Sequence, residues 1–400
     1  MDRRRFLRLG LLSAGVPLAG RINGVSWAAS PSVLTPASAS AAASPYAHLL
    51  ILVELKGAND GLNTVIPYSD PLYAQMRPKI AIARDQVLAL SEREGLHPSL
   101  NPLMPLWQNK ELAVIQGVGY PKPNLSHFRS IEIWDTASNS EEYLGAGWLA
   151  RTFAAMPTPF QFAADGVVVG SSDMGPLSGP QVRTIALADT RQFLQQARLA
   201  KPDGDQRNAA LKHILGVESE IVHAAAKLNT NYAFKTEFPK NNFGNQIRTA
   251  SQLVASNAGM ATIRLTLSGF DTHAGQLGTQ ANLLKDLAEG LAALKASLTE
   301  LNRWDSTTIM TYSEFGRRPK ENQSGGTDHG TASAHFVMGG SVKGGLYGQA
   351  PQLSRLDGNG NLPFAVDFRS LYATVIDKWW RGDSSKILGG KFDTLDLLSA

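Results

Sequence analysis

Four short apolar segments are the clearest elements that the chain predicts. They cover residues 48–55, 112–117, 261–267 and 307–312, and each one leads directly into turn residues. A short apolar run bounded by turns is typical of a strand that is buried on both faces of a sheet. The pattern therefore predicts an α/β fold with a mostly parallel central sheet between layers of helices.

A long amphipathic helix is predicted between the third and fourth of these strands. Its apolar positions recur at alternating steps of three and four residues: Leu284, Leu287, Leu291, Leu294, Leu298 and Leu301. A helix that connects two strands forms a crossover, which predicts that the strands run parallel. The stripe also fits a coiled-coil seam, but fewer than three heptads lie between the strands, which favours packing on the core.

Three further segments complete the predicted organisation. Residues 189–256 are mainly polar with helical periodicity, clearest over 191–200 and 208–228, and could form a helical cap over the sheet. Residues 364–380 are predicted to form a closing helix, and the glycine pairs around Lys343 a hairpin. We therefore expect one α/β domain over residues 45–400 with a helical insertion.

The first 44 residues have the pattern of an export signal. A run of arginines at residues 3–5 precedes an uncharged apolar stretch at 9–19, and small residues follow at 28–44. The apolar stretch is too short for a stable membrane span, so the pattern predicts a twin-arginine signal peptide and a flexible linker. Cleavage fits after Ala28 or after Ala39. A basic start to a cytosolic helix is the alternative.

The predicted location is periplasmic or extracellular, and the twin-arginine export machinery is the expected partner. Five arginines and one aspartate leave with the signal, so the 38 basic and 34 acidic residues of the chain become 33 of each. No basic run then remains that would indicate nucleic acid or an anionic membrane as a partner. Because the chain has no cysteine, disulfides, thiolate chemistry and metal sites with cysteine ligands are excluded.

Acidic and imidazole residues gather in the turns that follow the predicted strands. Parallel strands end at one edge of a sheet, so these side chains should converge there. The oxygen candidates are Asp60, Asp271, Glu314 and Asp328, and the nitrogen candidates are His273, His329 and His335. Clustered carboxylates repel one another unless a cation offsets their charge, which predicts a divalent metal: zinc, manganese, magnesium or calcium.

Most of these residues also have a purely structural interpretation. Asp60 in an Asn-Asp-Gly sequence fits an Asx turn, and Asp271 with His273 fits a helix cap. Glu314 could pair with Arg317, and His335 could be a core histidine. Asp328 and His329, between glycines, have no evident structural role.

The sequence resembles the bacterial "domain of unknown function 1501" family over nearly the whole mature chain. Five stretches carry the resemblance, in order residues 55–67, 125–128, 269–276, 311–317 and 326–330. That family looks similar to the alkaline-phosphatase-like superfamily, which includes phosphatases and sulfatases. The resemblance implies a sheet between helix layers and two metals at the C-terminal edge of its strands.

The same resemblance implies roles for single residues. Asp60 matches the aspartate after the first strand, and Ser126 matches the nucleophile. Asp328 and His329 share one metal, while Asp271 and His273 hold the second with His335 as a third ligand. The Asp271–His273 spacing of two departs from the usual four of the superfamily. Ser126 could equally be a helix N-cap.

The leading hypothesis is metal-assisted hydrolysis of a phosphate or sulfate ester, with an anionic small molecule as substrate. Two metals would activate the Ser126 hydroxyl, and Arg129 or Arg317 would steady the anionic group. The main alternative is an exported binding or assembly protein that keeps the fold without turnover. A carbohydrate- or envelope-binding module is a third alternative, although the tryptophans are scattered along the chain.

Overall fold

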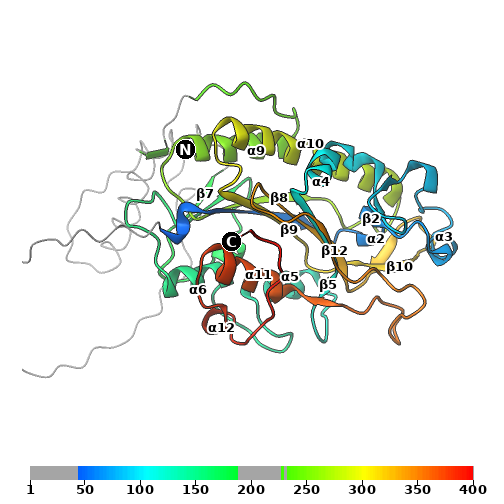
Figure 1. Ribbon diagram of the computed structural model, residues 1–400. Coiled ribbons are helices and arrows are strands. Elements are labelled where there is room, and N and C mark those ends of the chain that lie inside the picture. The colour runs from blue at the N-terminus through cyan, green and yellow to red at the C-terminus, as the bar shows by residue number, and fades with distance from the viewer. Residues whose placement is uncertain (1–43, 188–226, 229–231, 400) are drawn as a thin grey trace, which may run out of the picture.

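The computed structural model describes residues 44–187, 227–228 and 232–399 (Figure 1). The predicted signal peptide and most of its linker lie outside these residues. The helical stretches predicted at 191–200 and 208–228 also lie outside them, except for the last two residues of the second stretch.

A nine-stranded sheet forms the centre of the molecule. Its order is β13 (Gly345–Gly348), β5 (Leu112–Gly119), β12 (Ser333–Met338), β9 (Thr307–Tyr312), β1 (Leu49–Lys56), β8 (Thr262–Ser268), β6 (Gly166–Val169) and β7 (Thr184–Leu187), and β14 (Val366–Asp367) pairs with β5. All strands run in one direction except β12. The four predicted strands are confirmed as β1, β5, β8 and β9, and the mostly parallel sheet is confirmed with them.

Strand β1 lies between β8 and β9 and is buried on both faces. Leu50 is opposite Thr262 in β8 and Thr308 in β9. Side chains of β1 alternate between two apolar cores, because successive residues of a strand point to opposite faces. This explains why the segment is apolar without a polar face.

Helices cover both faces of the sheet (Figure 1). One layer contains α4 (Met104–Gln108), α9 (Asn242–Ala255) and α10 (Gln276–Glu300), and the other contains α5 (His127–Thr136), α6 (Trp148–Ala155), α11 (Phe368–Thr374) and α12 (Ser384–Ile387). The leucine stripe of α10 packs into the core, so the predicted crossover is confirmed. Within the predicted cap segment, α9 is helical and belongs to the same layer.

Short elements collect at the end of the sheet where β1, β8 and β9 finish (Figure 1). They include α2 (Gly61–Thr64), α3 (Pro71–Met76), a small sheet of β2 (Val65–Ile66), β4 (Gly95–Leu96) and β3 (Leu88–Ala89), and a ribbon of β10 (Arg317–Glu321) with β11 (Thr327–His329). The end of the sheet where these short elements collect carries the candidate site. The 3-10 helices of the fold lie at Pro45–Ala47, Arg84–Gln86, Pro98–Leu103 and Gly175–Leu177.

Two local predictions are corrected. The closing helix begins at Phe368 rather than at 364, because the Asp367 side chain accepts the Arg369 amide there, and it continues as a π-helix over Val375–Trp379. The predicted hairpin does not form, because β12 and β13 pair with opposite edges of β5 instead of with each other.

Within the described ranges, none of the helices combines the length and the apolar character that crossing a membrane requires.

Candidate metal centre

The polar turns after three strands come together at one point, as the sequence predicts. Asp271 follows β8, Glu314 follows β9, and the turn after β5 leads to His127, the first residue of α5. The ribbon of β10 and β11 adds His329. Parallel strands end at the same edge of a sheet, which is why residues so far apart in the chain meet.

Four residues with potential metal-ligand atoms meet at this point, and we call them the imidazole–aspartate cluster: His127, Asp271, His273 and His329. The Nε2 atom of His329 lies 3.0 Å from that of His127 and 2.9 Å from that of His273. Oδ1 of Asp271 lies 3.4, 3.1 and 3.4 Å from the Nε2 atoms of His127, His273 and His329. Ligands around a tetrahedral zinc ion are separated by roughly 3.3 Å, so the spacings among His127, Asp271 and His329 fit a single cation, and His273 lies beside Asp271 and His329.

Hydrogen bonds on the far side of the rings direct two Nε2 lone pairs toward the shared point. Nδ1 of His127 contacts Oε1 of Glu314 at 2.7 Å, and Nδ1 of His329 contacts the Leu125 carbonyl at 2.8 Å. Both acceptors require a proton on Nδ1, which leaves Nε2 unprotonated in the neutral ring. Lone pairs that face each other at 3.0 Å repel, and a cation between them removes that repulsion.

The outer carboxylates support the rings rather than face the shared point. Glu314 is buried, and its Oε1 also accepts the Gly57 amide. Asp328 is exposed, lies 3.6 Å from Nδ1 of His273 and accepts a hydrogen bond from Asn322. The sequence predicts both as direct ligands, but the geometry places them behind imidazoles, where a carboxylate fixes the ring orientation.

The electrostatics of the cluster are uneven. The hydrogen bond from Glu314 raises the pKa of His127, whereas burial and the nearby Arg317 charge lower the pKa of His329. Partial burial opposes ionisation of Asp271, but the hydrogen bond and the charge of Arg317 outweigh it and lower the pKa of Asp271. Asp271 therefore stays a carboxylate at neutral pH.

Solvent reaches the cluster from one side. The Asp271 side chain is 48% exposed and that of His273 46%, whereas His127 and His329 are about half as exposed. On the buried side the Phe315 ring packs at 4.9 Å from both the His127 and the His329 rings. A small solute can thus approach the open face.

Arg317 ties the strand ends together and is not free to bind a substrate anion. Its buried guanidinium donates to the carbonyls of Gly57, Ala58, Phe270 and Thr327 and to Oδ1 of Asp271 at 2.6 Å. Its predicted role is corrected accordingly. It holds Asp271 in place and does not pair with Glu314.

Arg129 is likewise committed to the fold. Its guanidinium donates to the carbonyls of Asn139, Ser140 and Glu142, pairs with Glu132 and lies 3.8 Å from the centre of the Tyr143 ring. These contacts organise the loop after α5. These contacts favour a structural role for Arg129 over the predicted anion binding.

Asp60 lies outside the cluster. Its Oδ1 caps α2 at the Leu62 amide, and both of its oxygens accept from Arg77, at 2.5 and 3.0 Å. Gln276 donates to it as well, and the side chain is 1% exposed. Its charge is neutralised and its lone pairs are occupied, so the structure favours the cap interpretation over a metal ligand.

His335 also lies outside the cluster. It sits within β12 and is 1% exposed, with its ring 5.3 Å from that of Trp134. Neither ring nitrogen has a hydrogen-bond partner among the described residues. Burial lowers the pKa of His335 to about 3. It is a neutral core residue, because its position in the strand turns it toward the helix layer.

Ser126 stands at the N-terminus of α5, beside His127, and is exposed. Its amide is held by Asn124, while its hydroxyl makes no hydrogen bond to any described part of the chain. It is therefore at the capping position without a capping bond. Its hydroxyl is exposed at the N-terminal end of α5, next in the sequence to His127.

His127 belongs to the cluster but is not among the site residues predicted from the sequence. It lies within the stretch 125–128, in which only Ser126 is a predicted site residue. The signal was present, because a histidine directly after a turn that follows a buried strand belongs to the same edge as Asp271. The structure assigns it together with Asp271 and His329 as a group able to hold a metal ion.

Comparisons with known proteins agree with the motifs. A family model described as "Protein of unknown function (DUF1501)" matches residues 95–389, which include four of the five motif stretches. No curated protein matches the chain.

Solved structures resemble the chain at low identity. The C-terminal periplasmic domain of EcEptC from Escherichia coli, in complex with Zn, has 12% identity and a TM-score of 0.38 over 73% of this chain and 72% of that chain. Alkaline phosphatase from the Antarctic bacterium TAB5 has 11% identity and a TM-score of 0.34, over 76% and 95%. The PsFucS1 sulfatase from Pseudoalteromonas sp. has 10% identity and a TM-score of 0.36, over 87% and 70%.

Proposed function

We propose that the chain, which belongs to the family described as "Protein of unknown function (DUF1501)", is a metal-dependent hydrolase of phosphate or sulfate esters. The observation that carries the proposal is the convergence of three Nε2 atoms and one carboxylate oxygen in the imidazole–aspartate cluster. The substrate is an anionic small-molecule ester.

The donor set narrows the choice of metal. Three imidazoles and one carboxylate suit zinc or manganese better than calcium or magnesium, which prefer oxygen ligands. His127, His273, His329 and Asp271 would hold the ion. When bound, such an ion supplies Lewis-acid polarisation of a phosphoryl or sulfuryl oxygen.

Two features of the chain itself support hydrolysis. Ser126 offers an exposed hydroxyl next to His127, as a nucleophile requires. It stands at the N-terminus of α5, where the positive end of the helix dipole stabilises a bound oxyanion. Neither Arg129 nor Arg317 takes part in anion binding in this proposal, because both are committed elsewhere.

The alternative is an exported binding protein that keeps one metal without turnover. The close contact of Arg317 with Asp271 supports it, because the guanidinium already offsets the one aspartate charge of the cluster. The sealed Asp60 supports it as well, since a second metal would then lack that carboxylate.

A metal analysis and an activity screen test the proposal. Purified protein is assayed for bound zinc and manganese, and then against phosphate and sulfate monoesters with each metal. We expect about one ion per chain and ester hydrolysis that Ser126→Ala abolishes, while Ser354→Ala, at another exposed serine, leaves it unchanged. Protein that binds no divalent ion, or full activity in Ser126→Ala, would contradict the mechanism. Metal binding without hydrolysis of any ester supports the binding protein.

Export through the twin-arginine pathway to the periplasm or the medium belongs to the same proposal. The arginine run and the short apolar stretch of residues 1–44 support it. Replacing Arg3, Arg4 and Arg5 with lysines should keep the protein in the cytoplasm, and cell fractionation measures this. Unchanged export of that variant would contradict the pathway.

A further inference from the structure

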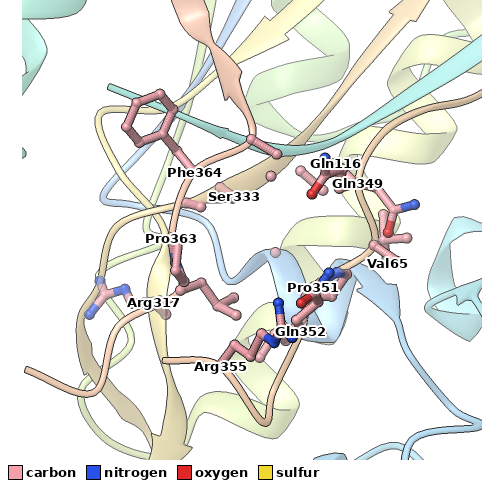
Figure 2. A pocket seen from close by; sticks show the side chains of 18 residues that line it. Val65, Gln116, Arg317, Ser333, Gln349, Pro351, Gln352, Arg355, Pro363 and Phe364 are labelled. Atoms are coloured by element: carbon pink, nitrogen blue, oxygen red, sulfur yellow. The ribbon is translucent and has the colours of Figure 1, made fainter. Parts of the chain in front are cut away.

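A cavity of about 290 Å³ opens beside the candidate metal centre (Figure 2). It lies between the end of β5, the start of β12, α2 and the segment 349–365. None of the four cluster residues lines it. Arg317 borders it, but its guanidinium points away from the space, toward its contacts with Asp271 and the strand-end carbonyls (Figure 2). The cavity is thus a separate space at the same edge of the sheet.

One buried polar group in this cavity has no partner. Gln116 is 4% exposed, and its Oε1 accepts no hydrogen bond from any described residue. The Gln116 amide thus keeps hydrogen-bonding capacity that the fold leaves unused, which favours a polar ligand group at this wall of the cavity. Figure 2 shows the Gln116 amide directed into the open space, with Gln349 beside it.

The charge of the cavity is positive. Arg355 lines it and makes no ion pair within the described ranges, and no acidic side chain is among the lining residues. The guanidinium of Arg317 is already engaged elsewhere. Arg355 is therefore the group available to an anion in this space.

The opposite wall is apolar. Leu362 and Pro363 line this side of the space, Phe364 lies at its edge with its ring directed away from the other lining side chains, and Val65 lies on the side of Gln349 (Figure 2). A wall of this kind suits a ligand with a C–H face, while amide groups suit hydroxyls, which both donate and accept hydrogen bonds. A sugar ring carries both kinds of surface.

We propose that this cavity binds a saccharide that carries an anionic group, such as a uronate, a sulfate or a phosphate. Gln116 binds ring hydroxyls, Leu362 and Pro363 contact the C–H face, and Arg355 pairs with the anion. The size of the cavity admits about one or two sugar rings. The site goes beyond the proposed ester hydrolysis and does not depend on a bound metal.

Ligand-detected NMR with a chelator present tests the proposal. The probes are galacturonate, galactose 6-sulfate, galactose 6-phosphate and neutral galactose, which separate the three anions from an uncharged ring. We expect at least one anionic probe to bind more tightly than galactose. Gln116→Leu and Arg355→Gln should each weaken that binding about tenfold or more, because each removes a hydrogen-bonding group.

Two controls keep the result interpretable. Arg93→Gln, at an exposed arginine outside the cavity, and His329→Ala, in the cluster, should leave binding unchanged. Thermal melting checks that each variant is folded. Binding of none of the probes at about 10 mM would overturn the proposal. So would equal binding of galactose, or anion binding that only His329→Ala removes. Failure of ester hydrolysis leaves this result unaffected.

Discussion

Two aspartates at the same edge of the sheet meet an arginine in different ways. Asp60 follows β1, and both the Asp60 and Arg77 side chains are fully buried, in a two-pronged ion pair. Asp271 follows β8 and contacts the buried Arg317 through one oxygen, while its side chain remains half exposed among three imidazoles. The same residue type therefore serves the fold in one place and offers a ligand in the other.

The difference lies in how many lone pairs the partners occupy. Arg77, Gln276 and the Leu62 amide use both oxygens of Asp60. Asp271 Oδ1 has Arg317 on one side and the Nε2 atoms of the cluster on the other. Burial with full pairing indicates a structural carboxylate, and exposure among imidazoles indicates a functional one.

Breaking the buried ion pair of Asp60 and Arg77 should have the largest effect, which is on the stability of the fold. Arg77→Met leaves the buried Asp60 charge without its partner, so we expect the free energy of unfolding to fall by about 3–5 kcal/mol. Urea denaturation measures it. Arg93→Met, at an exposed arginine, is the control and should change stability by less than about 0.5 kcal/mol. A loss of under about 1 kcal/mol for Arg77→Met would mean that the pair contributes little.

Breaking the half-exposed pair of Asp271 and Arg317 should instead weaken metal binding. Asp271→Asn removes the one carboxylate of the cluster, and we expect zinc affinity to fall about a hundredfold or more in a competition titration with a chelator. Asp328→Asn is the matched control, because Asp328 lies 3.6 Å behind His273, and should cost less than about tenfold. Similar losses in both variants would remove Asp271 from the ligand set.

Glu314 tests whether the outer carboxylate matters. Glu314→Gln keeps the size of the side chain but loses the charge that raises the pKa of His127, and we expect metal affinity to fall about 10–100-fold. The His127 pKa, followed by NMR without metal, should fall in the same variant. An unchanged pKa would show that the hydrogen bond does not act as described.

At neutral pH the smallest effect concerns His335, a buried imidazole without a hydrogen-bond partner among the described residues. Its folded pKa of about 3 lies below the ordinary 6.5, so the unfolded state binds the extra proton as the pH falls between these values. Wild type should therefore lose stability relative to His335→Phe by up to about 1.4 kcal/mol per pH unit in that window. At pH 7 the variant should be more stable by about 1–2 kcal/mol. Parallel pH profiles of the two proteins would contradict this.

The sequence predicted the sheet well because its strands are buried on both faces. Strands β1, β5, β8 and β9 carry continuous apolar runs, and the leucine period of α10 is equally direct. The convergence of Asp271, His273 and His329 followed from the shared strand edge. These features depend on local pattern and on simple topology.

What the sequence could not supply is which partner each polar side chain meets. Asp60 and Asp271 both follow buried strands, and nothing in the spacing of Arg77 marks it as the partner of Asp60. His335 differs from a ligand only in the face of β12 to which it points, which a one-residue change of register reverses. Which side chains meet depends on the tertiary fold and is not encoded in the local sequence pattern.

The central place of β1 has a consequence for synthesis on the ribosome. The first strand of the domain has both neighbours, β8 and β9, near the other end of the chain, and the Trp379 and Trp380 indoles donate to the carbonyls of Leu49 and His48. A nascent chain therefore exposes an unpaired, aggregation-prone apolar strand until translation is nearly complete. The domain closes only when its two ends meet, so premature stop codons should yield chaperone clients rather than half-folded fragments.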